Sequence, residues 1–164
     1  MFLRIRVDNY LCYMYKEYSP CSVLAPFIYH FWEYKGETRS GLKFNIPPHG
    51  CSDFVFIVGN AADCIRDSLI MKPYHSYFFG PMNTFTELVA HTNFIHIIGV
   101  RFRPCGLFQF IEIPLNELAN QGIDSQEFPV LFSQSFIYQL CESNQNPIDI
   151  IEHELVRQVY KNNM

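Results

Sequence analysis

The hydrophobic pattern of the chain changes its period at one step, Arg103-Pro104, and this change limits the folds that are possible. Before the step, apolar segments with alternating or continuous character cover residues 28–34, 42–46, 52–58, 74–79, 85–90 and 94–102. Alternation indicates half-buried strands, and a short apolar run between turn residues indicates a buried strand. About six strands at this spacing predict a sandwich or barrel rather than a βαβ sheet. The last two segments are expected to form a hairpin across Thr92-Asn93.

Beyond Pro104 the apolar spacing becomes helical. Residues 107–111 and 114–118 fit short helical turns, and residues 128–141 fit a longer helix. Asn146-Pro147 is typical of a helix start, with Asn as the N-cap and Pro at the first helical position. The helix that follows carries one apolar stripe, which consists of Ile148, Ile151, Leu155 and Val159. The predicted fold class is therefore mainly β with C-terminal helices, an α+β arrangement.

The length of 164 residues fits one domain with a sizeable core. The 16 acidic side chains outnumber the 12 Lys and Arg, which gives a formal net charge of −4. Domains that neutralise many phosphates usually carry a basic stripe, so this chain by itself is not expected to bind DNA or RNA. The sequence shows no apolar run of about 20 residues and no signal-peptide pattern. We therefore expect a cytoplasmic protein that makes no membrane contact.

Six cysteines stand at positions 12, 21, 51, 64, 105 and 141. A chain of this length folds without covalent staples, and no targeting pattern points to an oxidising compartment, so we expect reduced, mostly buried thiols. No two cysteines lie closer than nine residues, whereas zinc sites use ligand pairs at short spacing. A structural zinc site is therefore not expected.

Three groups of segments resemble a known family in their order and spacing. They read LAPFI (24–28) with FWE (31–33); NIPPHGCSDFVF (45–56); and FGPM (79–82) with IIGVRFRPCG (97–106) and IPLNEL (113–118). Over residues 20–140, this set is similar to the N-terminal sensor domain of one branch of AraC-family bacterial transcription regulators. His49 departs from the pattern, because the family commonly has an acidic residue in this turn, so no polar role is carried over to that position.

The resemblance implies a cupin-like β-barrel or jelly roll with a small helical cap, which binds an effector or mediates dimerisation. It implies a sensor domain over residues 1–145, with the cap from about residue 104, and a linker or dimerisation helix over residues 146–164. In full-length relatives this helix leads to a pair of helix-turn-helix units that bind DNA. The sequence ends at Met164, so we expect a sensor without its DNA-binding domain. The apolar stripe of the last helix is the candidate dimerisation surface, and docking on its own barrel is the alternative.

Four residues are candidates for an effector pocket: Trp32, Asp53, His96 and Phe102. The single tryptophan either forms a stacking wall with Tyr29, Phe31 and Tyr34 or packs in the core. Asp53 either contacts a ligand, as His49 also can, or accepts backbone N–H groups in a tight turn, and we favour the turn. Alternation places His96 and Phe102 on one face of a strand. There His96 either meets an effector or is a core histidine bonded to a neighbour.

The opposite face of the same strand carries Arg101 and Arg103. If the face of His96 lines the barrel interior, both arginines project outward. There they are expected to be solvated or to pair with Glu87 or Glu112, or to meet a partner domain.

The sequence lacks motifs that carry known catalytic chemistry. Metal-dependent cupin sites use two histidines separated by one residue, and no His-x-His occurs. A G-x-S-x-G elbow, a P-loop and G-x-G-x-x-G are also absent. We therefore expect no catalytic residue, metal, cofactor or enzyme activity; the expected partners are a small-molecule effector, a second copy of the chain, and DNA only through a C-terminal region. The alternatives are a small metal-dependent cupin enzyme, with His75, His91 and His96 as ligands, and a ligand-free dimerisation module.

Overall fold

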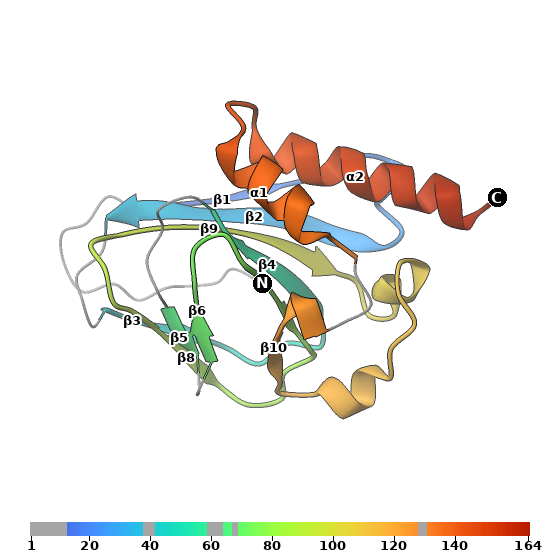
Figure 1. Ribbon diagram of the computed structural model, residues 1–164. Helices are drawn as coiled ribbons and strands as arrows, with labels where there is room; N and C mark the ends of the chain where they lie inside the picture. The colour runs from blue at the N-terminus through green and yellow to red at the C-terminus, as the bar shows by residue number, and fades with distance from the viewer. Residues whose placement is uncertain (1–12, 38–41, 59–63, 67–68, 128–130) are drawn as a thin grey trace.

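Two antiparallel sheets face each other and form the body of the molecule (Figure 1). The computed structural model describes residues 13–37, 42–58, 64–66, 69–127 and 131–164. The first sheet has, in order, β1 (Tyr13–Tyr18), β2 (Ile28–Glu37), β9 (Phe94–Phe102), β4 (Ser52–Ile57), β7 (Ser76–Phe79) and β10 (Gly122–Asp124). The second has β3 (Leu42–Ile46), β8 (Thr86–Ala90), β5 (Cys64–Arg66) and β6 (Leu69–Met71). The structure confirms the expected class, a mainly β fold with C-terminal helices.

The predicted hairpin of residues 85–90 and 94–102 is wrong, although both strands exist. β8 pairs with β3 and β5 in one sheet, whereas β9 pairs with β2 and β4 in the other. The chain therefore crosses between the sheets at residues 91–93. Each strand already has partners on both edges, so a short turn between them does not make them neighbours.

Two α-helices follow the sheets, α1 (Gln134–Glu142) and α2 (Pro147–Asn162). Ser133 caps α1, because its hydroxyl accepts the backbone N–H of Phe136. Asn146 caps α2 by accepting that of Ile148, and proline stands in the first turn, so the predicted helix start is confirmed. α1 begins later than the predicted helix, whose residues 128–130 lie outside the described residues. Short 3-10 helices between β9 and α1 cover Gly106–Gln109, Leu115–Leu118 and Ser125–Glu127.

Both α-helices cover the outer face of the six-stranded sheet (Figure 1). The apolar stripe of α2 packs there, with exposed fractions of 4% for Ile148, 0% for Ile151, 0% for Leu155 and 5% for Val159. It shares a core with side chains of β2, β4 and β9. These four side chains are therefore occupied within the protomer. A role of α2 in dimerisation stays a prediction, and it requires the other face of the helix.

A second core lies between the two sheets, and β9 contributes to both cores. Ile95 and Ile97 belong to the core between the sheets, whereas Ile98 and Phe102 belong to the core under the helices. The predicted alternation is correct, but the expected direction is reversed: Arg101 points between the sheets, and the face of Phe102 meets the helices. Because both faces of the strand are covered, no polar face marks its outside.

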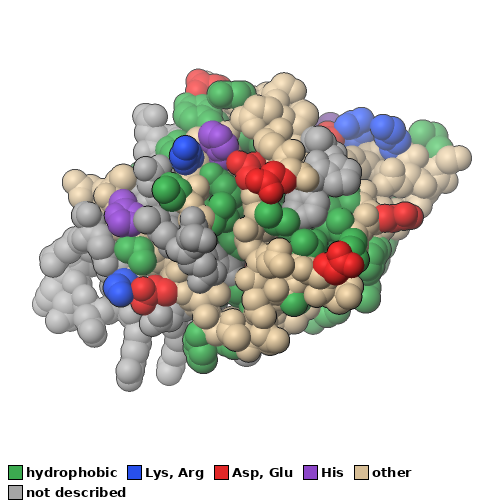
Figure 2. Space-filling view, turned by 60° about the horizontal axis from the view of Figure 1, so that its bottom comes forward, with side chains coloured by type: hydrophobic (Ala, Val, Ile, Leu, Met, Phe, Trp, Pro, Cys, Tyr) green, Lys and Arg blue, Asp and Glu red, His purple; other side chains and the backbone are tan. Residues whose placement is uncertain are grey.

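The surface of the described residues carries few cations. On the face in Figure 2, Lys and Arg side chains stand apart from one another, except near the end of α2, and the described ones form no continuous stripe. None of the described helices is long and apolar enough to span a membrane.

The described cysteines are free thiols, as predicted. Cys21, Cys51 and Cys141 are half-buried and Cys105 is exposed, so their burial is lower than expected. The side chains at positions 12 and 64 lie outside the described part.

Candidate functional site

A cavity of about 80 Å³ lies between the two sheets. Apolar side chains form most of its wall: Ile46, Val55, Met71, Phe79, Met82, Leu88, Ile95 and Ile97. The remaining lining residues are Tyr15, Trp32, Tyr34, Asp53 and Arg101. The volume is several times the roughly 10–15 Å³ that one water needs and lies below the roughly 300–1,000 Å³ of pockets for drug-sized ligands. The cavity therefore suits a small molecule.

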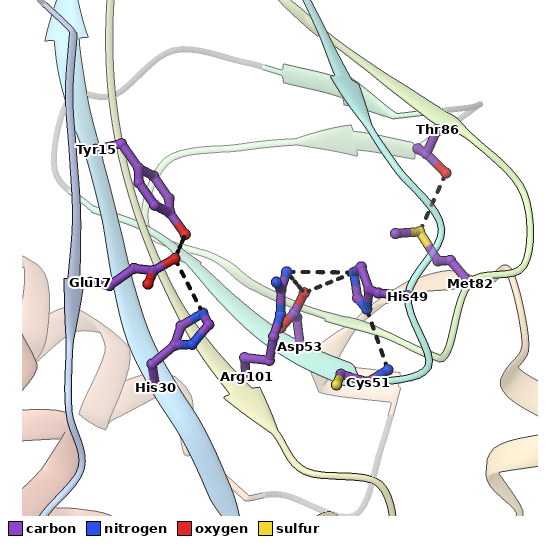
Figure 3. A network of polar contacts seen from close by, with 9 residues as sticks. All are labelled: Tyr15, Glu17, His30, His49, Cys51, Asp53, Met82, Thr86 and Arg101. Atoms are coloured by element: carbon purple, nitrogen blue, oxygen red, sulfur yellow. Dashed lines mark hydrogen bonds and ion pairs between the residues drawn. The ribbon is translucent and has the colours of Figure 1, made fainter. Parts of the chain in front are cut away.

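The strand register places charged groups in one row across the six-stranded sheet. Arg101 of β9 is in register with Asp53 of β4 and with His30 of β2. Arg101 donates from Nε to Asp53 Oδ1 at 2.9 Å and from Nη2 to Oδ2 at 2.9 Å (Figure 3). This fork is the strong, bidentate form of an arginine–carboxylate pair. Burial would lower the pKa of Arg101, but the charge and hydrogen bonds of Asp53 outweigh burial and raise it, so the guanidinium stays charged.

The turn before β4 adds His49 to this ion pair. The backbone N–H of Cys51 donates to His49 Nδ1 at 3.3 Å, which in a neutral imidazole leaves the proton on Nε2. That nitrogen lies 3.5 Å from Asp53 Oδ2 and 3.5 Å from Arg101 Nη2. We expected Asp53 to accept a backbone N–H group in this turn. The Cys51 N–H is instead accepted by His49, because the Asp53 carboxylate faces Arg101.

A second polar group lies next to this pair on β1 and β2 (Figure 3). The Tyr15 hydroxyl donates to Glu17 Oε1 at 2.9 Å, and His30 Nε2 is 3.8 Å from the same oxygen. Burial, and then the hydrogen bond to Glu17, raises the pKa of Tyr15. Burial lowers the pKa of His30. Tyr15 therefore stays a neutral donor, and the uncharged His30 leaves the Glu17 carboxylate unbalanced within this group.

Trp32 lies flat across β9 because a glycine stands opposite it. Trp32 and Gly99 are in register, and a Cβ at Gly99 would come within 1.9 Å of the indole ring. The ring stacks on Tyr15 with a centroid distance of 6.5 Å. Its Nε1 is buried, and no described residue accepts the hydrogen. The cavity wall therefore contains a buried donor that has no acceptor in the part of the chain that the structure describes.

His96 lies on the face of β9 that points away from the cavity. Its Nε2 is 2.7 Å from Glu33 Oε1, and the Tyr18 hydroxyl donates to Glu33 Oε2 at 2.8 Å. Burial would raise the pKa of Glu33, but these two hydrogen bonds outweigh burial and lower it. Burial lowers the pKa of His96, which Glu33 offsets only in part, and burial raises the pKa of Tyr18 to about 12. His96 is therefore a neutral histidine bonded to a neighbouring carboxylate.

We expect acid to destabilise the fold through His96 and Glu33. The unfolded chain protonates histidine near pH 6.5, whereas folded His96 has a lowered pKa and stays neutral to a lower pH. In that interval the unfolded state binds more protons, so the free energy of unfolding falls as the pH drops. Glu33, whose pKa lies below its ordinary value of 4.5, extends the fall to still lower pH. At neutral pH, the free energy of unfolding has not yet been reduced by the protonation of either group.

Urea titrations from about pH 7.5 to about pH 4 measure this effect. His96→Gln keeps a donor for Glu33 and is expected to flatten the profile below about pH 6.5 while the fall below about pH 4.5 remains. Some slope persists above pH 4.5, because the pKa of His30 is also lowered. A His96→Gln profile that superimposes on the wild type would contradict this assignment.

The structure brings two of the four predicted pocket residues to the cavity. Trp32 and Asp53 line it, whereas His96 does not, and Phe102 is fully buried on the helix side. The sequence reasoning missed Arg101 and Tyr15 as lining residues. A signal for Arg101 existed, because Asp53 stands in a strand that reads as buried, and a buried carboxylate needs a partner.

The aromatic wall expected around Trp32 forms only in part. Tyr34 lines the cavity beside it, whereas Phe31 packs in the core under the helices. Tyr29 is 46% exposed, and the guanidinium of Arg103 lies 4.4 Å from the centre of its ring. Arg103 also donates to the carbonyl of Ala25 at 2.8 Å.

Glu87, one of the two acidic partners expected for the arginines, pairs instead with Lys43 at 3.0 Å. Among the described residues, no group of three or more His, Cys, Asp or Glu side chains is placed to hold a metal ion. His75 contacts the carbonyl of Pro73 at 2.8 Å, and His91 is exposed. The described residues therefore do not form the alternative three-histidine site.

No curated protein matches this chain. Three solved structures are similar at a TM-score of 0.42. They are the EutQ protein of Clostridium difficile (11% identity, 60% of this chain and 76% of that chain), a Cupin 2 conserved barrel domain protein of Salinispora arenicola CNS-205 (15%, 65% and 87%) and KdgF of Halomonas sp. (12%, 58% and 84%).

One family model matches the chain and covers most of its sheets. Its description is "Domain of unknown function (DUF6597)", and the match covers residues 16–124. This range begins within β1, ends with β10 and includes every residue that lines the cavity except Tyr15. Because the match spans more than half of the sequence, this chain belongs to the DUF6597 domain family.

Proposed function

We propose that this chain is the effector-sensing domain of an AraC-type transcription regulator and that it takes a small molecule into the cavity between its sheets. The resemblance over residues 20–140 supports the class of regulator. The sensing role depends on one observation above all: the lining of an apolar cavity includes the mostly buried Arg101–Asp53 pair and an indole N–H that no described residue accepts. Homodimerisation through α2 and DNA binding through a helix-turn-helix region outside this sequence are parts of the same proposal.

β9 is one of the strands that connect the cavity to the helices; β2, β4 and β7 also contribute side chains to both. Ile97 and Arg101 line the cavity, whereas Ile98 and Val100 pack in the same core as the stripe of α2. A ligand shifts an equilibrium only by its differential affinity for the two states. In the proposed mechanism, a ligand that prefers one position of β9 therefore changes the position of α2.

A thermal-unfolding scan with a library of small molecules tests the sensing role. A ligand at about 100 times its Kd is expected to add about 2.7 kcal/mol to the free energy of unfolding, which raises Tm by about 5–10 °C in a domain of this size. Gly99→Ala is the matched variant, because its Cβ displaces Trp32 from the cavity wall. A true cavity ligand stabilises the wild type and loses most of its effect on this variant.

Three other measurements on the purified protein can contradict the proposal. Sequence-specific DNA binding by these 164 residues in a gel-shift assay would contradict the division between sensor and DNA-binding region. Stoichiometric zinc, iron or manganese in the purified protein would favour the metal-dependent enzyme. A stable dimer that no library member stabilises would favour the ligand-free dimerisation module.

A further inference from the structure

At the polar end of the cavity, Trp32 and Arg101 carry N–H groups for which no described residue supplies an acceptor. The indole N–H of Trp32 is buried and has no acceptor among the described residues. Arg101 carries five N–H donors, and its bonds to Asp53 come from Nε and Nη2, so Nη1 is left without a described acceptor. The Tyr15 hydroxyl donates its hydrogen to Glu17, so it is not a further unused donor. A molecule in the cavity is therefore complementary to this end if it presents a hydrogen-bond acceptor.

The charges around this end do not favour an anion. Asp53 neutralises Arg101 within the bidentate pair, whose carboxylate side chain is 8% exposed. The Glu17 carboxylate is adjacent, and the lowered pKa of His30 leaves that histidine uncharged beside it. A ligand carboxylate would lose its hydration and meet a net negative surrounding, which is unfavourable in an apolar cavity.

The remaining wall defines the body of the ligand. It consists of aliphatic, thioether and aromatic side chains, among them Val55, Met71 and Leu88. The volume of about 80 Å³ limits the ligand to a small molecule. We infer that the cavity selects a small, uncharged molecule with an apolar body and one acceptor oxygen, such as a ketone, which accepts the indole N–H of Trp32.

This inference rests on the proposed sensing function and names the chemical class of its ligand. Three probes of similar shape test it by isothermal calorimetry: cyclohexanone, methylcyclohexane and cyclohexanecarboxylate. We expect cyclohexanone to bind most tightly and the carboxylate most weakly. Trp32 is the only tryptophan, so its fluorescence reports the same event directly.

Trp32→Phe separates the donor from the apolar wall. This variant keeps an aromatic ring but removes the N–H. It is expected to lower the affinity for cyclohexanone by about three- to tenfold and to change the affinity for methylcyclohexane little. Tyr29→Phe is the control, because Tyr29 lies on the same strand, is 46% exposed and does not line the cavity. The Tyr29→Phe variant is expected to bind the three probes with the same affinities as the wild type.

Binding of the three probes to the wild type tests the inference even if a variant folds poorly. Tighter binding of the carboxylate than of the ketone, or binding of none of the three probes, overturns the inference on ligand class. The sensing function fails separately, if no member of the broad library stabilises the wild type.

Discussion

Replacing Arg101 by methionine is expected to lower the free energy of unfolding by about 3–5 kcal/mol. The side chains of Arg101 and Asp53 are 16% and 8% exposed, and they form two hydrogen bonds of 2.9 Å. Methionine removes the charge but leaves the Asp53 carboxylate buried without its cation. Breaking one half of a buried pair is strongly destabilising for this reason. Urea unfolding followed by circular dichroism measures the change.

Three further variants identify the cause of this loss. Asp53→Leu combined with Arg101→Met removes both charges and is expected to recover most of the stability. Arg101→Lys keeps the charge but loses the fork, so an intermediate loss is expected. Arg157→Met is the surface control, because its bidentate pair with Glu154 is exposed, and little change is expected. If Arg101→Met unfolds at the same urea concentration as Arg157→Met, the buried pair does not contribute as described.

Leu155→Ala is expected to lower the free energy of unfolding by about 2–5 kcal/mol. Leu155 is fully buried in the core that α2 forms with the six-stranded sheet. Truncation removes apolar contacts and leaves a cavity between the helix and the sheet, and both effects destabilise the fold. The same urea titration measures the loss, and it is expected to be independent of protein concentration.

The control for this variant is Tyr160→Ala on the same helix. Tyr160 is 58% exposed, so its truncation is expected to leave the unfolding midpoint nearly unchanged. Sedimentation of both variants separates packing from dimerisation. If Leu155→Ala dissociates a dimer while the stability of the monomer is unchanged, the stripe is an interface and does not pack as the structure places it.

Local sequence was enough to predict several elements. Alternation predicted residues 42–46 and 94–102 with the bounds that β3 and β9 have in the structure. Asn146-Pro147 marked the start of α2, because an N-cap side chain and a proline in the first turn act within a few residues. Trp32 and Asp53 stood out as chemically unusual positions, and both line the cavity.

Contacts between distant residues could not be predicted in this way. The predicted hairpin of β8 and β9 is wrong because each strand pairs with other strands, although only three residues separate the two. His96 and Phe102 do not line the cavity as predicted. Alternation defines the two faces of a strand but does not show which layer each face contacts. Arg101 was expected outside for the same reason.

Periodicity and capping among near neighbours predicted the mainly β class, the approximate positions of β2, β3, β4, β7, β8 and β9, the start of α2 and its amphipathic stripe. The short strands β5, β6 and β10, and β1 before residue 28, were not predicted. The tertiary structure was needed to show that the stripe packs on its own sheet and that Arg101 lines the cavity. Asp53 and Arg101 are 48 residues apart in the chain and meet because β4 and β9 pair in one register. Both faces of that sheet are covered, so the direction of each side chain depends on the layers around it and not on its local pattern.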